Sequence, residues 1–221
     1  AFGISADRLL ATGVPRTDIF FDEAYAEQKK AELFDRFAQF KGKQIILFAP
    51  TFRGDGFNSA HYPKEYVDFD RLADFCRNNN SAIIFKMHPF VKDFVIPFGY
   101  EDVFEDATEI REINDLLFGA DLLITDYSSV VYEASTLNIP MLFYAYDLEE
   151  YISKRDFYEP FETFVPGKIV KDFDSMIAAI YNGNFEQEKV EPFCQRNFEF
   201  RDGGSTDRVI DWLILGNLPQ K

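Results

Sequence analysis

The 221-residue chain lacks the features that define several large classes of protein. Its two cysteines, Cys76 and Cys194, are too few for a disulfide framework, which indicates a reducing compartment. No apolar run approaches the roughly 18 residues of a membrane-spanning helix, and no signal peptide opens the chain. Acidic residues outnumber basic ones 38 to 23, so the formal charge is −15. That balance argues against nucleic acid as a partner and against polybasic docking on a membrane.

The chain also lacks an internal repeat, a low-complexity tract and a long linker. Its cysteines show no metal-ligand spacing, and no Ser/His/Asp order suggests a hydrolase, so we expect neither a metal nor a cofactor. With 47% apolar and 28% charged residues, the composition is that of a soluble globular protein, which we expect to form one domain over residues 1–221. The chain begins with Ala1 instead of Met, which suggests a piece of a longer protein.

Apolar strands alternate with amphipathic helices along the chain. Strands are expected at 44–49, 82–87, 103–104, 121–125 and 140–144, with a strand or loop at 163–170. Helices are expected at 22–40 with Asp22 as N-cap, and at 67–79, 110–118, 128–137, 172–181 and 205–215. This alternation predicts an α/β fold with a doubly wound, mostly parallel sheet. In such folds, ligands bind at the carboxyl ends of the strands.

The first polar segment at a strand end is Pro50-Thr51-Phe52-Arg53-Gly54. A threonine hydroxyl, an arginine and a flexible glycine suit a phosphate or a nucleotide at this place. A plain turn between a strand and a helix would use the same proline and glycine. The segment alone therefore leaves both interpretations open.

The second segment is Lys86-Met87-His88-Pro89, again at a strand end. Lys86 and His88 lie on the same face because they are two residues apart. Together they can neutralise a diphosphate, or His88 can donate to the oxygen of a leaving phosphate. A partly buried histidine satisfied by the backbone is the alternative, and the position at a strand end favours function. The other histidine, His61, is expected to be a solvated loop residue.

The third segment, Thr125-Asp126-Tyr127-Ser128-Ser129, leads from a strand into a helix. The two serines and the free N–H groups of the helix start form a candidate anion site. Glu133, one turn further, is placed to reach a ribose or glycerol hydroxyl. Ordinary N-capping with a solvated glutamate would explain the same residues without a ligand.

Two further segments contain a turn. Residues 201–208, Arg-Asp-Gly-Gly-Ser-Thr-Asp-Arg, predict a glycine turn and a helix capped by Ser205. Residues 11–18 form a turn that carries Arg16. Arg16, Arg53, Lys86 and His88 can still make a local anion site, because net charge does not exclude one.

Taken together and in order, these segments resemble the CDP-glycerol glycerophosphotransferase family, the teichoic-acid polymerases and primases of Gram-positive bacteria. The matching segments are ATGVPRTD (11–18), ILFAPTFRG (46–54), IIFKMHP (83–89), DLLITDYSSVVYEA (121–134), IPMLFYAYDLEEY (139–151) and RDGGSTDR (201–208). Similar enzymes use CDP-ribitol, so the polyol of the donor stays open.

The resemblance implies a two-lobed architecture of the GT-B type, in which this chain is the Rossmann-like, carboxyl-terminal lobe that binds the CDP-linked donor. A missing amino-terminal lobe would supply the general base and the acceptor contacts. The implied reaction transfers glycerol phosphate or ribitol phosphate to a hydroxyl of a polymeric or lipid-linked acceptor and releases CMP. The parent protein would be cytoplasmic and peripheral on the inner face of the cell membrane.

The resemblance also assigns roles to single residues. His88, as the catalytic residue of this lobe, would hold the diphosphate with Arg16 and the Ser128-Ser129 helix start. The other implied binding residues are Pro50 and Thr51 on the nucleotide side, Lys86, Met87, and Glu133 on sugar or polyol hydroxyls; Arg53 joins them because it suits a phosphate. Relatives carry Asp where this chain has Glu133, which is one methylene longer.

Two other functions remain open on the residues alone. One is a lobe of a sugar-nucleotide-dependent glycosyltransferase or epimerase of the same architecture, because a fold does not determine a function. The other is a non-catalytic nucleotide-binding module.

Overall fold

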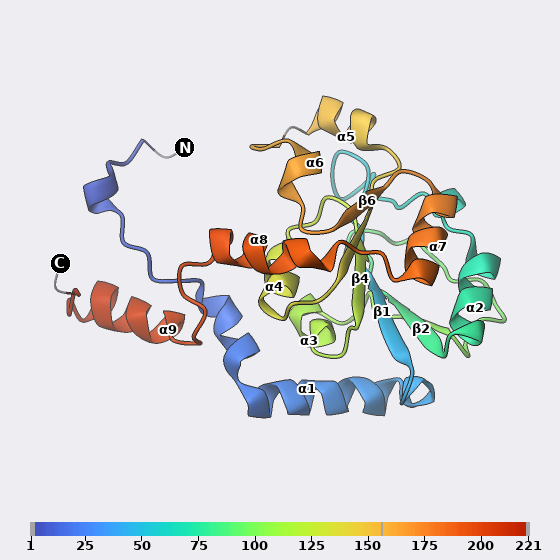
Figure 1. The fold of residues 1–221 in the computed structure, drawn as a ribbon, viewed down its shortest axis with the longest axis horizontal. Coiled ribbons are helices and arrows are strands. Elements are labelled where there is room, and N and C mark those ends of the chain that lie inside the picture. Colours follow the sequence, from blue (N-terminus) through green and yellow to red (C-terminus); the bar gives the residue numbers. More distant parts are fainter. Residues whose placement is uncertain (1–2, 156, 220–221) are drawn as a thin grey trace.

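Six parallel strands form the centre of the molecule (Figure 1). The structure is a computed structural model that describes residues 3–155 and 157–219. The strand order is β3-β2-β1-β4-β5-β6, and every neighbouring pair is parallel. The strands are β1 (Gln44–Phe48), β2 (Ser81–Phe85), β3 (Phe104–Asp106), β4 (Leu122–Thr125), β5 (Met141–Tyr144) and β6 (Lys168–Val170). The predicted doubly wound α/β fold is confirmed.

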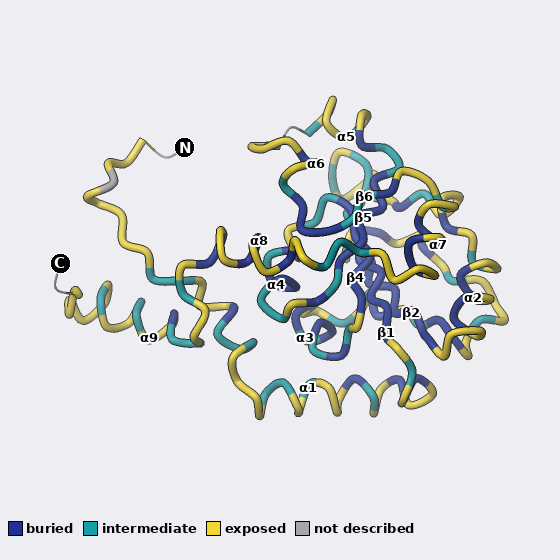
Figure 2. Tube along the Cα trace, viewed as in Figure 1, coloured by how far each residue is buried: buried dark blue, intermediate teal, exposed yellow. Residues whose placement is uncertain are grey.

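Apolar side chains cover both faces of this sheet. In β1, Ile45 and Leu47 belong to one buried cluster, whereas Ile46 and Phe48 belong to another, because successive side chains point to opposite faces. The first cluster includes residues of α1 (Glu23–Arg36), α3 (Ile113–Leu117), α4 (Val130–Thr136) and α8 (Val190–Asn197). The second includes residues of α2 (Phe69–Asn78) and α7 (Phe173–Asn182). The sheet is therefore the buried middle layer of the molecule (Figure 2).

Most predicted elements are present, with bounds that differ by a few residues. Asp22 is the N-cap of α1, as predicted, and its Oδ1 accepts a hydrogen bond from the N–H of Tyr25 at 3.0 Å. The region 163–170 contains a strand only at Lys168–Val170. Within residues 3–155 and 157–219, three α-helices were not predicted, α5 (Leu148–Lys154), α6 (Phe161–Phe164) and α8, and the expected turn at 11–18 runs into a 3₁₀-helix at Pro15–Phe21. In α8, Pro192 lies in the first turn. Backbone N–H groups there have no partner within the helix, so the proline costs no helical hydrogen bond.

The last helix begins differently from the prediction. Ser205 is the first residue of α9 (Ser205–Arg208), not its N-cap, and the helix continues as a π-helix over Val209–Ile214. The cap comes from the other end of the chain: the carboxylate of Asp18 accepts hydrogen bonds from the N–H groups of Ser205 and Thr206. The amino-terminal and carboxyl-terminal segments consequently lie together at one side of the sheet (Figure 1).

No helix in the described ranges combines the length and apolarity that a bilayer span requires. Cys76 and Cys194 are both buried and unpaired.

Candidate functional site

A pocket of about 190 Å³ lies where β1 separates β2 from β4, at the carboxyl ends of these strands. The chain winds in opposite directions on the two sides of this point, which is where doubly wound sheets bind ligands. We call it the switch-point pocket. Its lining includes seven residues predicted from the sequence: Arg16, Pro50, Lys86, Met87, His88, Ser128 and Ser129. Pro50 follows β1, residues 86–88 follow β2, the two serines precede α4, and Arg16 comes from the amino-terminal segment.

The lining of this pocket is basic, although the whole chain is acidic. Arg16, Lys86 and Arg111 line it, and none of the carboxylates in the described part of the chain does. Lys86 is buried, and its ammonium donates a hydrogen bond to the carbonyl oxygen of Thr108 at 3.1 Å. Burial lowers the pKa of Lys86, against the attraction of nearby carboxylates. An anion in the pocket would offset that cost by stabilising the charged amine.

His88 is held in one orientation by its neighbours. Its ring packs against Phe52 and Phe90, with centroid distances of 4.7 and 4.6 Å. Its Nδ1 accepts a hydrogen bond from the N–H of Phe90 at 3.2 Å. Burial and the charge of Lys86 lower the pKa of His88, so the ring is neutral at pH 7 and carries its proton on Nε2. His88 is therefore an N–H donor for a ligand oxygen.

The two serines before α4 differ in their hydrogen bonds. The helix begins at Val130, two residues later than predicted, and the N–H of Val130 donates to Ser128 Oγ at 3.3 Å. Ser129 occupies the N-cap position, but its side chain makes no capping hydrogen bond. The Ser129 hydroxyl is thus left for a ligand.

Arg16 and Glu133 form an ion pair beside the pocket, with 2.6 Å between Arg16 Nη2 and Glu133 Oε1. Glu133 is only 7% exposed, and no partner within the described ranges reaches its Oε2. Burial raises the pKa of Glu133, and the nearby Arg16 only partly opposes this shift. Glu133 does not line the pocket, but it forms an ion pair with Arg16, which does.

Two predicted residues point elsewhere. The N–H of Thr51 donates to Asp126 Oδ1 at 2.7 Å, and Thr51 does not line the switch-point pocket. Arg53 donates from Nε and Nη2 to both carboxylate oxygens of Asp147, at 2.5 and 2.8 Å, and lies 3.0 Å from the buried Asp126. Its guanidinium also lies over the ring of Tyr127 at 5.1 Å. Arg53 is therefore an internal cross-link, with little donor capacity left for a phosphate.

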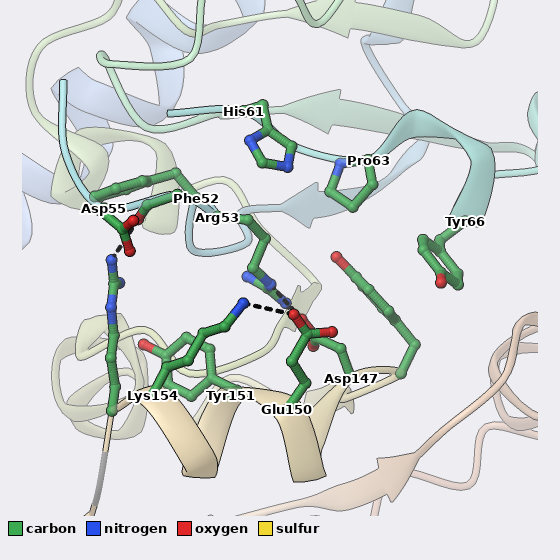
Figure 3. Close-up of a pocket in the computed structure, with 13 residues that line it drawn as sticks. Phe52, Arg53, Asp55, His61, Pro63, Tyr66, Asp147, Glu150, Tyr151 and Lys154 are labelled. Atoms are coloured by element: carbon green, nitrogen blue, oxygen red, sulfur yellow. Dashed lines mark hydrogen bonds and ion pairs between the residues drawn. The ribbon is translucent and has the colours of Figure 1, made fainter. Parts of the chain in front are cut away.

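Arg53 forms part of a second pocket, of about 290 Å³, which we call the tyrosine pocket (Figure 3). One wall is the segment 52–66, with Phe52, His61 and Tyr66, and the other is the segment 146–155, which includes α5. Arg53 and Asp147 join the two walls. His61 is exposed, as predicted, and its Nδ1 lies 2.9 Å from the carbonyl oxygen of Ser59.

Sequence reasoning missed Arg111 and the whole tyrosine pocket. Arg111 follows β3 at the same sheet edge as Lys86, so an accurate end for that strand would have indicated it. Tyr146 and Asp147 follow β5 in the same way. Within the described ranges, no group of His, Cys, Asp or Glu residues is arranged to hold a metal ion.

A family model described as CDP-glycerol:poly(glycerophosphate) glycerophosphotransferase matches residues 1–215. The chain belongs to this family. The ribitol-phosphate polymerase TarK of Staphylococcus aureus (strain NCTC 8325 / PS 47) is 53% identical over 97% of this chain and 42% of its own length. Three relatives named as ribitol-phosphate polymerases are 46 to 53% identical, and four named for glycerol phosphate are 28 to 34% identical.

Solved structures agree with this membership. The wall teichoic acid polymerase TagF matches with a TM-score of 0.77 at 26% identity, over 99% of this chain and 54% of that one. A variant of TagF soaked with CDPG gives a TM-score of 0.81. A UDP-N-acetylglucosamine 2-epimerase gives 0.55 at 14% identity, which shows a shared fold alone. The family resemblance expected from the six segments is confirmed, and the chain spans 31 to 54% of the length of these relatives.

Proposed function

We propose that this glycerophosphotransferase-family chain is the donor-binding lobe of an enzyme that transfers a polyol phosphate from a CDP-linked donor to an acceptor hydroxyl. One observation carries the proposal: in a chain of charge −15, the pocket at the switch point is lined by Arg16, Lys86 and Arg111 and by no carboxylate among residues 3–155 and 157–219. Such a lining stabilises an anion with more than one negative charge, such as a diphosphate. The donor is CDP-ribitol, because the three ribitol-phosphate polymerases are 46 to 53% identical and the two poly(glycerol phosphate) polymerases only 30 to 31%.

In the proposed reaction, the acceptor oxygen attacks the phosphorus that carries the polyol. A new P–O bond forms, the P–O bond within the diphosphate breaks, and CMP leaves with the electron pair. The Nε2–H of His88 donates to the diphosphate, and Lys86 and Arg16 offset its charge. Catalysis of this kind comes from positioning and charge stabilisation, so the residues need no covalent role. A base outside this chain takes the proton of the acceptor hydroxyl.

The remaining parts of the proposal concern the parent protein. We propose that it has a second, upstream lobe that completes the cleft, since the chain spans 42% of TarK and 54% of TagF. The acceptor is a teichoic acid chain, as the names of the relatives indicate. The parent protein would act at the inner face of the cell membrane, where a lipid-linked acceptor would be reached.

Calorimetric titration with CDP-ribitol, CDP-glycerol, CMP and a UDP-sugar tests the proposal. We expect CDP-ribitol to bind, and His88→Ala to weaken this binding about tenfold, the effect of a lost hydrogen bond to a charged group. Tyr181→Ala is the control, because it also removes a ring, from an exposed residue that lines neither pocket. Equal affinity of wild type and His88→Ala would refute the role of His88. A preference for the UDP-sugar would instead indicate a sugar-nucleotide enzyme.

A further inference from the structure

The tyrosine pocket lies directly beside the switch-point pocket. Phe52 lines the tyrosine pocket and His88 lines the switch-point pocket, and their rings are in contact with centroids 4.7 Å apart. The contacting rings of Phe52 and His88 would therefore separate a molecule in the tyrosine pocket from the proposed diphosphate donor. This position is suited to a second substrate.

The chemistry of the two pockets differs. The tyrosine pocket presents both signs of charge, with Asp55 and Glu150 among the acids and Lys154 and Arg155 among the bases. Carboxylates would repel a bare diphosphate, but they accept hydrogen bonds from polyol hydroxyls. Lys154 Nζ lies 2.6 Å from Glu150 Oε1, so these two charges offset each other, and Arg155 adds a positive charge for a single phosphodiester. The lining thus suits a ligand with both hydroxyls and a phosphate.

Aromatic faces complete this lining. Tyr66 and Tyr146 stack with their centroids 4.1 Å apart, and Tyr66 is 44% exposed. The guanidinium of Arg155 lies 5.2 Å from the ring of Phe52 and 5.7 Å from that of Tyr151. Flat apolar rings beside hydrogen-bonding groups favour the carbon backbone of a polyol, whose C–H and O–H groups alternate.

The pocket is also fixed in shape before a ligand arrives. Arg53 joins its two walls through the paired hydrogen bonds to Asp147, and Arg155 Nη2 donates to the carbonyl oxygen of Gly54 at 2.7 Å. The segments 52–66 and 146–155 are therefore tied at two places (Figure 3). A preformed pocket lowers the ordering cost of binding.

We infer that the tyrosine pocket binds the terminal polyol-phosphate unit of the acceptor chain. This inference rests on the proposed function, and it assigns the acceptor to a site on the donor-binding lobe itself. The volume of about 290 Å³ is near the lower bound of small-ligand pockets, so it suits one unit of the polymer. The rest of the acceptor chain would leave through the open side of the pocket.

NMR titration of the ¹⁵N-labelled chain tests the inference. The probes are a synthetic ribitol-phosphate tetramer, CDP-ribitol and CMP, and the reporters are the amides of Gly54 and Tyr151, which line the pocket and are unchanged in every variant. The variant is Tyr66→Ala with Lys154→Gln, which changes two side chains at the exposed rim. The control is Tyr181→Ala with Lys171→Gln, at exposed positions outside the pocket. The spectra themselves show that each variant is folded.

We expect the tetramer to bind the double variant about tenfold more weakly than wild type, with CDP-ribitol affinity unchanged and the control equal to wild type. Equal tetramer affinity in the variant, or no tetramer binding at millimolar concentration, overturns the acceptor site. The acceptor site is also overturned if the double variant loses affinity for CDP-ribitol but not for CMP. That result would place the donor's own polyol in the pocket. If wild type binds the tetramer but not CDP-ribitol, the proposed donor function fails while the polyol-phosphate site stands.

Discussion

Asp18 and Ser205 are 187 residues apart in the sequence and are joined by a hydrogen bond: the Ser205 N–H donates to Asp18 Oδ1 at 3.0 Å. The other carboxylate oxygen of Asp18 accepts from the N–H of Thr206 at 2.7 Å. A residue from the amino-terminal segment therefore caps the last helix. Arg16 lies two residues before Asp18, so the same contact holds Arg16 at the rim of the switch-point pocket.

Removal of this cap is expected to destabilise the chain. Asp18→Ala should lower the free energy of unfolding at pH 7 by about 1 kcal/mol, the usual effect of losing a helix cap. Urea denaturation followed by circular dichroism measures the change. Asp35→Ala, at an exposed position of α1, is the control and should leave stability within about 0.5 kcal/mol of wild type.

The pH dependence of this effect distinguishes a charged cap from a packing contact. Burial raises the pKa of Asp18, but hydrogen bonds from Thr206 and Ser205 outweigh it, so the pKa lies below the ordinary 3.8. A carboxylate with a lowered pKa stabilises the fold above the unfolded value and loses this effect as pH falls through the folded pKa. The difference between wild type and Asp18→Ala should therefore shrink at low pH. A difference that does not change down to pH 2 would contradict the assignment.

The sequence predicted the sheet and the switch-point pocket well because both follow from local patterns. Apolar runs such as 44–49 define buried strands, and the rule for strand ends then brings Lys86, His88 and Ser128 together. The cap from Asp18 could not be predicted, because nothing local relates residue 18 to residue 205. Arg53 shows a second limit of sequence-based prediction. Its position at a strand end is typical of a ligand-binding residue, but its ion-pair partner Asp147 is 94 residues away, so no local pattern reveals the pair.

Arg53 is expected to act on stability. Arg53→Met leaves Asp126, which is 1% exposed, and Asp147 without their shared cation. Loss of one partner of a buried ion pair lowers the free energy of unfolding by about 3 kcal/mol. Thermal and urea denaturation at pH 7 measure this loss. The control is Arg36→Met, since Arg36 forms an exposed ion pair with Glu109 and should contribute less than about 1 kcal/mol. Wild-type stability in Arg53→Met, together with a loss of CDP-ribitol affinity, would return Arg53 to the donor site.

His88 is expected to report diphosphate binding through its titration. Burial and the nearby Lys86 lower the pKa of His88 below 6.5 in the free chain. A bound diphosphate adds negative charge beside the ring, which favours the protonated form and raises the pKa. NMR titration of the imidazole resonances with and without CDP-ribitol measures both values, and the two histidines make assignment simple. An unchanged or lower pKa of His88 with ligand bound would contradict the proposed contact.

Glu133→Gln is expected to preserve the stability of the fold and to weaken the binding of CDP-ribitol. Burial raises the pKa of this carboxyl above its usual value of 4.5 despite the ion pair with Arg16. A carboxyl with a raised pKa favours the fold when protonated, so the folded state loses stability as pH rises from the unfolded pKa through the folded one. Glu133→Gln removes this loss and should be at least as stable as wild type at pH 7, by urea denaturation.

The same variant should bind CDP-ribitol about tenfold more weakly if the unpartnered Oε2 accepts a hydroxyl of the donor. Glu133 also holds Arg16, so a weaker affinity has two possible origins, and a double-mutant cycle with Arg16→Gln separates them. If Glu133 contacts the donor directly, Glu133→Gln lowers affinity even where residue 16 is already Gln. If it acts only by positioning Arg16, the double variant binds as weakly as Arg16→Gln alone, and the direct contact is refuted.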